Sequence, residues 1–153
     1  MSVRLPPLDE LALNWWRIEP LLRRATQITG CYEPIDVLQL AMLGRVGIWL
    51  AGDTQQLPGA DRAGIWLAGD IDAVIVTEVK EYPRRRVLEM MFCGGDKMAN
   101  WLEEAIAVMD EHAKSTGCSH IACIGRPGWE RVWRGRRTGD VVMVRELKDH
   151  ADG

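Results

Sequence analysis

Hydrophobic residues change their spacing near residue 46 of this chain, and that change limits the folds it can adopt. Before that point, apolar side chains recur every three or four residues, as they do along one face of a helix. After it come short runs of apolar, β-branched and aromatic residues separated by Gly, Asp and Pro, which are typical of antiparallel strands joined by turns. Helical spacing then returns from residue 96. This order predicts an α/β fold with a mixed, mostly antiparallel central sheet flanked by helices.

Three short helices are predicted in the first third of the chain, after a small strand at residues 2–5. The first covers Leu8–Ile18. Pro20 should interrupt it, because proline supplies no N–H to a helix interior but fits the first turn of a new helix. The second helix then runs to Gly30, and the third begins at Pro34.

The remaining elements follow the same two patterns. The run Ala73–Thr77 is apolar on both faces, which predicts a central strand. A long amphipathic helix is expected over Asp96–Gly117, with Asp96 as its N-cap, and a short one over 128–134. We expect a single domain over residues 1–153, with a frayed tail at 148–153. The predicted strands are 46–51, 64–68, 73–80, 86–92, 120–124 and 141–146.

The sequence Gly-Ile-Trp-Leu-Ala-Gly-Asp occurs twice, at Gly47–Asp53 and at Gly64–Asp70. Two copies are too few for a solenoid, which needs at least three units to bury its faces. We interpret residues 46–70 as containing a duplicated strand, in which one copy is the original strand and the other is an inserted strand or an extended loop. Chance reuse of a good strand is the alternative.

Composition and charge narrow the classes of partner. Hydrophobic residues make up 47% and charged residues 27%, which is typical of soluble globular chains. The formal net charge of −3 gives no reason to expect nucleic acid or acidic lipid as a partner. No apolar run is long enough to cross a membrane. The four cysteines show no C-x-x-C pair, so we expect a reducing compartment such as the cytoplasm.

One stretch of the chain is basic, although the net charge of the whole chain is negative. Arg126–Arg137 carries five arginines, with Trp129 and Trp133 among them. Such a patch could bind nucleic acid, a coenzyme phosphate or an acidic protein surface. The alternative is a solvated helix face whose tryptophans fill the core, which their spacing favours.

Four segments of the chain resemble a known family. Ile75–Pro83 and Arg86–Phe92 read as paired strands, and Cys93–Trp101 reads as a glycine-containing turn that opens a helix; Gly117–Trp129 adds a strand and a following helix. In these segments the chain resembles the GNAT superfamily of acetyl-coenzyme A-dependent N-acetyltransferases, with matching element order from about Val3 to Leu147. More narrowly, it resembles the divergent GNAT-like proteins encoded in bacteriophage structural gene clusters.

The resemblance implies a site for acetyl-coenzyme A where the strand turns into the helix. Backbone N–H groups at such a turn can bind a pyrophosphate, and glycines let it approach closely. We therefore expect Gly94→Val to abolish coenzyme binding while sparing the fold. The turn departs from the family pattern of Arg or Gln, two residues, Gly, one residue, then Gly or Ala, and a plain strand-to-helix turn is the alternative. The residues implied are Met91, Phe92, Cys93, Gly94, Gly95, Lys97 and Met98.

The resemblance also implies a catalytic base. Glu89 matches the position where several family members carry one, and we expect apolar surroundings for it. The alternative is an ion pair with one of Arg84, Arg85 or Arg86. The family's tyrosine acid has no counterpart, because the predicted helix carries Trp129 and Trp133 instead.

A zinc site is the remaining chemical candidate. Cys118 and His120 point to one side of a predicted strand and Cys123 to the other, so one metal ion would not gather them easily. We therefore expect no metal.

Two functions follow. The first is a phage-encoded GNAT-like protein that has lost acetyl transfer and has a virion-associated or assembly role, in the host cytoplasm or in the virion, with other virion proteins or its own copies as partners. The alternative is an active acetyl-coenzyme A-dependent N-acetyltransferase that acts on an unknown amine.

Overall fold

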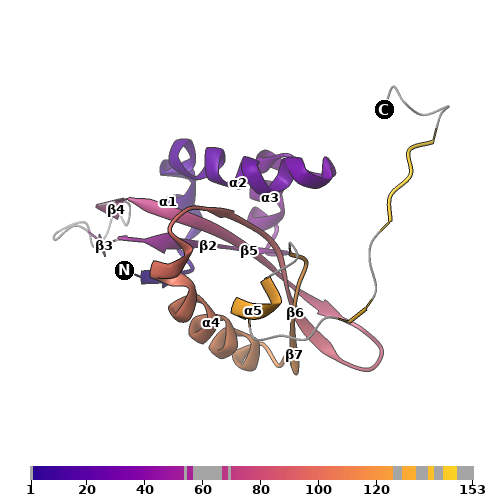
Figure 1. Cartoon of the computed structure of the whole chain (residues 1–153). Helices are drawn as coiled ribbons and strands as arrows, with labels where there is room; N and C mark the ends of the chain where they lie inside the picture. The colour runs from indigo at the N-terminus through magenta and orange to yellow at the C-terminus, as the bar shows by residue number, and fades with distance from the viewer. Residues whose placement is uncertain are drawn as a thin grey trace.

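A five-stranded sheet lies between two layers of helices in the computed structural model of this chain (Figure 1). The structure describes residues 2–53, 55–56, 67–68, 70–125, 129–133, 138–139 and 143–147. Of the helices in these ranges, none is both long enough and apolar enough to cross a membrane.

The sheet is mixed and mostly antiparallel, as the sequence predicts. Its strand order is β1-β2-β5-β6-β7, and every pair of neighbours is antiparallel except β6 and β7. A small separate hairpin is formed by β3 and β4. The strands are β1 (Ser2–Arg4), β2 (Gly47–Gly52), β3 (Gln55–Gln56), β4 (Leu67–Ala68), β5 (Ile71–Glu81), β6 (Arg86–Gly95) and β7 (His120–Cys123).

Helices cover both faces of the sheet and divide the core in two. Three N-terminal helices cover one face, and the long helix covers the other together with a short C-terminal one (Figure 1). Alternate residues of β5 serve the two cores: Val74 and Val76 pack toward the first, Ala73 and Ile75 toward the second, and all four are fully buried. The helices are α1 (Leu8–Leu13), α2 (Trp15–Thr29), α3 (Pro34–Met42), α4 (Met98–Ser115) and α5 (Trp129–Trp133).

The break between the first two helices lies at Asn14, so the prediction that Pro20 interrupts the helix is wrong. The buried Asn14 amide donates a hydrogen bond to the carbonyl of Glu10 over 2.9 Å, which favours a local turn over a continued helix. Pro20 lies inside α2 on its exposed side. A residue with an N–H at this position would donate to the carbonyl of Trp16, which is also on the exposed side. Water can replace that donor at an exposed position, which lowers the cost of proline there.

The predicted strand at 141–146 is not formed in its described part. Residues 143–147 have no regular secondary structure and extend away from the sheet (Figure 1), with Met143 and Val144 almost fully exposed. Apolar alternation predicted a strand there, but a strand also needs a partner, and these residues lie far from any sheet edge.

The first copy of the repeat forms β2. Its Leu50 and Ala51 are fully buried, and the Trp49 indole N–H donates to the Thr77 hydroxyl over 2.9 Å. Of the second copy, only residues 67–68 and Asp70 are described, so most of the predicted strand 64–68 lies outside the described residues. The first copy is therefore the one that pairs with both β1 and β5.

Deleting residues 47–63 should leave a folded protein. The second copy would then follow Val46 directly and could supply every side chain of β2, because the two sequences are identical. Residues 69–72 would form a short hairpin loop between Ala68 and Ala73, which gives up the pair that Gly52 makes with Ile71 in the full chain, and a shorter loop costs less closure entropy. We expect an unchanged circular dichroism spectrum and a melting temperature at or above that of the full chain.

A matched variant makes this test specific. Adding Leu67→Asp to the deletion places a carboxylate in the position of the fully buried Leu50 and should unfold the protein. A deletion variant that is itself unfolded would show that the two copies are not interchangeable.

Candidate functional site

Strands β6 and β7 pair over only part of their length. Residues 87–90 of β6 pair with residues 120–123 of β7, which ends there, whereas β6 continues to Gly95. Among the described residues, none therefore pairs with residues 91–95 on the β7 side, and some of their backbone N–H and C=O groups face the space beside the sheet.

A β-bulge lies where the two strands separate. On β5, Val76 pairs with Phe92 and Thr77 with Met90, so Met91 is an extra residue in β6. A bulge bends and twists the strand that carries it. Met91 and Phe92 both contact the core under α1–α3, instead of alternating between the two faces. The bulge therefore turns β6 at the point where it leaves β7.

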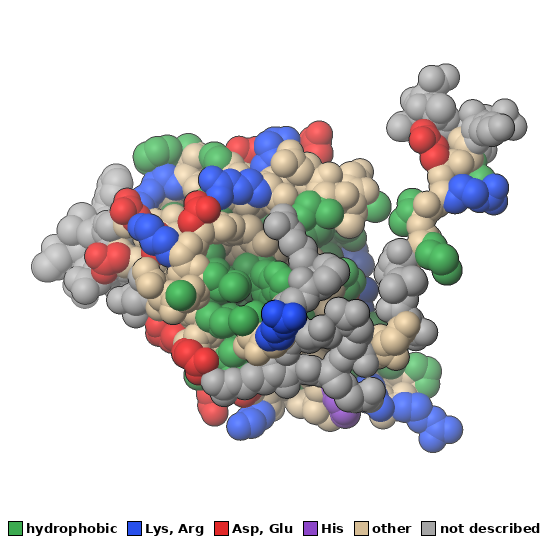
Figure 2. Space-filling view, in the orientation of Figure 1, with side chains coloured by type: hydrophobic (Ala, Val, Ile, Leu, Met, Phe, Trp, Pro, Cys, Tyr) green, Lys and Arg blue, Asp and Glu red, His purple; other side chains and the backbone are tan. Residues whose placement is uncertain are grey.

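A cleft of about 470 Å³ occupies this opening. Its described walls are the end of β6, the last turns of α2, residues 123–125 and Trp129. Figure 2 shows hydrophobic side chains gathered near the middle of this face, between the two helix layers. The lining residues in the described ranges are Arg24, Ala25, Ile28, Thr29, Met90, Met91, Phe92, Cys93, Gly94, Gly95, Cys123, Ile124, Gly125 and Trp129.

The structure brings five of the predicted cofactor residues to this cleft and leaves two outside it. Residues 91–95 line it. Lys97 instead forms an ion pair with the buried Asp72 over 3.2 Å, and Met98 packs against the core under α4. The wall contributed by α2 was not anticipated, because nothing local in the sequence of that helix indicates that it faces β6.

The two glycines of the turn are required by packing. A Cβ on Gly94 would lie 2.1 Å from the Leu21 carbonyl oxygen of α2, and one on Gly95 would lie 2.3 Å from the Asp72 oxygen of β5. Both neighbours are backbone atoms, which cannot rotate away. The expectation that Gly94→Val spares the fold is therefore wrong, since any side chain at this position pushes α2 off the sheet.

Gly94→Ala should lower the free energy of unfolding by about 1–3 kcal/mol, the usual cost of overpacking. Gly30→Ala, at the C-terminal end of the same helix α2, is the matched control: Gly30 has a φ of 69° but open space around it, so it should cost only about 1 kcal/mol. Urea denaturation measures both. Equal costs for the two variants would contradict the packing argument.

The two charged residues of the β6–α4 turn, Asp96 and Lys97, each form an ion pair with a residue outside the turn. We expected Asp96 to cap α4, but the N-cap residue is Lys97. Lys97 has a left-handed φ of 53°, and its side chain makes no capping hydrogen bond. The Asp96 carboxylate instead accepts from Nη1 of Arg24 at 3.0 and 3.1 Å. Its carbonyl accepts from the Trp101 indole N–H over 2.8 Å.

Glu89 lies outside the cleft lining, two residues before the bulge. Its side chain is 14% exposed, and one carboxylate oxygen is 3.7 Å from the ammonium of Lys80. It is opposite Glu78 on β5. The surroundings are therefore charged and not apolar as expected, and the partner is Lys80, whereas Arg86 pairs with Glu81.

Two thiols face the cleft and hold their protons tightly. Burial raises the pKa of Cys93 to about 12, with a smaller contribution from the nearby Cys123, and burial raises the pKa of Cys123 to about 11. Both therefore remain protonated at neutral pH and are poor nucleophiles. They can act as weak S–H donors in an otherwise apolar wall.

Alkylation should distinguish these thiols from the exposed Cys31. At pH 8, iodoacetamide should modify Cys31 first and leave Cys93 and Cys123 unmodified until the protein is unfolded, because only the thiolate reacts. Peptide mass spectrometry over a time course measures this. Modification of Cys123 at the rate of Cys31 would show that its thiol is not held in the protonated form.

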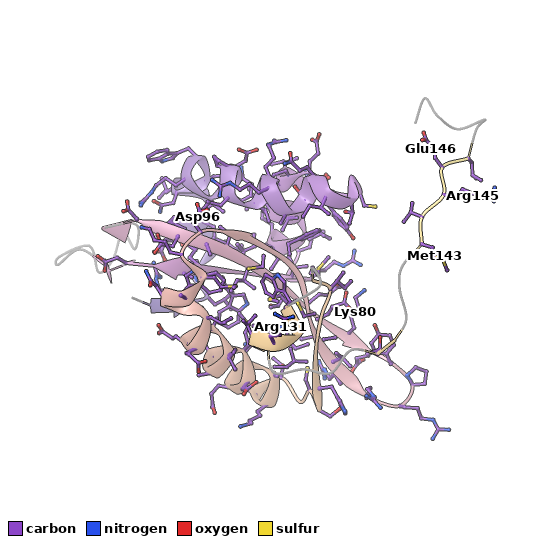
Figure 3. All side chains as sticks on the ribbon, viewed as in Figure 1. Lys80, Asp96, Arg131, Met143, Arg145 and Glu146 are labelled. Atoms are coloured by element: carbon purple, nitrogen blue, oxygen red, sulfur yellow. The ribbon has the colours of Figure 1, made fainter. Side chains whose placement is uncertain are left out.

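The predicted basic patch is only partly within the described residues. Arg131 is exposed (Figure 3), whereas Trp129 and Trp133 are half-buried against the core under α4. The other arginines of residues 126–137 lie outside the described residues. Within the described part of the chain, no group of three or more His, Cys, Asp or Glu side chains could hold a metal ion.

The architecture matches solved acetyltransferases. One is an aminoglycoside acetyltransferase from an uncultured soil metagenomic sample, in complex with sisomicin (TM-score 0.61, 10% identity, 95% of each chain covered). Another is a ribosomal-protein-alanine N-acetyltransferase from Brucella melitensis biovar Abortus 2308 (TM-score 0.58, 12% identity, 95% of this chain and 100% of that one). A third is an acetyltransferase from Trypanosoma brucei (TM-score 0.56, 15% identity, 95% and 99% covered).

The chain has the GNAT fold. At these identities the likeness shows the fold alone. No protein-family model matches the sequence, and no curated protein matches it. In this GNAT-fold chain, the cleft between β6 and β7 lies beside the turn for which the sequence predicted cofactor binding.

Proposed function

We propose that this protein binds an acyl-coenzyme A, with acetyl-coenzyme A as the reference ligand, in the cleft between β6 and β7 and transfers the acyl group to an amine. The observation that carries the proposal is the parting of the only parallel strand pair in the described sheet at a bulge, with a cleft of about 470 Å³ beyond it. A largely apolar cleft with backbone amides along one wall suits an extended chain that contains amide bonds.

The residues present fit such a ligand. Residues 91–95 of β6 offer backbone groups that no described strand pairs with on the cleft side, and these could bind amides of the pantetheine arm as an added strand would. Met91, Phe92 and Ile28 supply apolar contact. When bound, the coenzyme would supply a thioester, whose carbonyl carbon is open to attack by an amine.

Acyl transfer to an amine needs a group that accepts the amine proton and a group that stabilises the negative charge on the carbonyl oxygen. Transfer would join the amine nitrogen to the carbonyl carbon of the bound thioester and release the coenzyme as its thiol, so the amine would have to lose a proton and the leaving sulfur to gain one. In this proposal Glu89 accepts the proton that the amine loses, directly or through a water molecule. A backbone N–H near the bulge at Met91 stabilises the negative charge on the carbonyl oxygen.

Glu89→Gln tests the assigned base. The amide cannot accept the proton, so the turnover number should fall by about 10²–10⁴-fold while the affinity for acetyl-coenzyme A stays the same. Glu81→Gln is the control, because Glu81 is an exposed carboxylate of the neighbouring strand that pairs with Arg86. Equal turnover in all three proteins would remove Glu89 from the mechanism.

A second candidate keeps the fold without the transfer, as in a phage GNAT-like protein with a virion-associated or assembly role. The observation that favours it is the pair Trp129 and Trp133 on α5, where the family resemblance calls for a tyrosine acid. An indole cannot supply that proton near neutral pH. Tyr32 contacts Phe92 of the cleft with a ring separation of 5.5 Å, but it comes from the loop before α3.

Two measurements decide between the candidates. Calorimetric titration with acetyl-coenzyme A should give a dissociation constant in the micromolar range, and incubation with a panel of primary amines should release free coenzyme A thiol. No binding at millimolar ligand would overturn the proposed function. Binding without thiol release for any amine would favour the second candidate, which mass spectrometry of assembled phage particles would then test.

A further inference from the structure

Arg24 is the one charged residue among the described residues that line the cleft. The others are glycine, alanine, threonine, cysteine or larger apolar side chains. Pockets of this kind use their few polar groups to fix the orientation of the ligand. One cation among described lining residues that are otherwise neutral fits a ligand that is uncharged along most of its length and anionic at one end.

We propose that Arg24 binds a phosphate group of the coenzyme and so supplies, from α2, the cation that the β6–α4 turn does not provide. This inference rests on the proposed function and assigns the residue that orients the ligand. It places the phosphates at the Gly94–Asp96 end of the cleft and the thioester toward the bulge at Met91.

The position of Arg24 is set by the same packing that requires Gly94. The Leu21 carbonyl of α2 lies directly over Gly94, and Ala25 contacts the same point, so the helix is fixed close to the end of β6. Arg24 lies between these two residues in the sequence and reaches the turn, where it binds Asp96 (Figure 3 labels Asp96 beside α2). The guanidinium is therefore held at the mouth of the cleft.

The present partner of Arg24 is easily replaced. The side chains of Arg24 and Asp96 are 55% and 63% exposed, and an ion pair this exposed contributes little to stability. A phosphate offers more negative charge, and two of its oxygens can accept both N–H groups of a guanidinium fork. Without Arg24, the exposed Asp96 carboxylate would be hydrated by water and would not need another partner.

Lys97 is less suited than Arg24 to bind the phosphate, because it would have to leave a buried ion-pair partner. Its ammonium is 3.2 Å from Asp72, whose side chain is only 8% exposed. Moving Lys97 to a ligand would leave a buried carboxylate without its counter-charge, which is far more costly than releasing an exposed one. Of the two cations at the turn, Arg24 is the one free to exchange partners.

Calorimetric titration of single variants with coenzyme A and with pantetheine, which lacks the phosphates, tests the proposal at fixed low ionic strength. Arg24→Ala should weaken coenzyme A binding by roughly tenfold or more, the size of one charged hydrogen bond, and should leave pantetheine binding unchanged. Asp96→Asn should tighten coenzyme A binding, because it removes the competing carboxylate. Arg23→Ala is the matched control: Arg23 is the adjacent arginine of α2, pairs with Glu19 and does not line the cleft.

The outcomes separate this proposal from the proposed function. If the unmodified protein binds coenzyme A and Arg24→Ala binds it equally well, the assignment of Arg24 is wrong and the function stands. An equal loss of pantetheine affinity would also overturn it, since Arg24 would then act by shaping the cleft. No coenzyme A binding by the unmodified protein would overturn both. If Arg24→Ala proves unstable in a thermal melt, Asp96→Asn still tests the proposal. This variant should raise the affinity for coenzyme A, whereas Arg24→Ala should lower it.

Discussion

The pairing of β5 with β6 determines where every other feature of the cleft lies. β5 is buried on both faces from Asp72 to Thr77, and its alternate side chains anchor the two helix layers. Because β5 is held so firmly, the extra residue in the ladder is accommodated in β6 at Met91. The bend that results falls where β7 ends, and the cleft opens beyond it. A continuous ladder would leave β6 without that bend and would shift the faces of its first residues.

That register also decides the surroundings of Glu89. With the bulge, Glu89 is opposite Glu78 and lies near Lys80. Without it, the pairing of Val76 with Phe92 would extend to place Glu89 opposite Val79, whose side chain contacts the core under α4. A shift of one residue exchanges the faces of a strand. The charged surroundings of this carboxylate thus depend on a residue that is not itself charged.

Much of this fold could be predicted from the sequence, because the signals were local. The apolar run of β5, the stripe along α4 and the turns between strands depend on neighbouring residues, and these elements are confirmed. The break at Asn14 was missed because a buried side-chain amide outweighed the more visible proline. The bulge at Met91 has no sequence signal, since it exists only relative to the partner strand. The contact between Arg24 and Asp96 joins positions separated by 72 residues, and no pattern within α2 indicates it.

The connection between β2 and β5 enters the sheet at the same end as the turn that opens α4. Asp72, the second residue of β5, accepts the Asp96 N–H through its carbonyl over 2.8 Å and holds the Lys97 ammonium through its carboxylate. A Cβ on Gly52, at the end of β2, would collide with backbone atoms of Asp70 and Asp72, so β2 ends close against the start of β5. Gly52 and Asp70, described residues at the two ends of this connection, therefore lie close to the turn that opens α4. A change in the length of this connection would therefore act first on the turn that opens α4, while the strand carrying Glu89 stays unchanged.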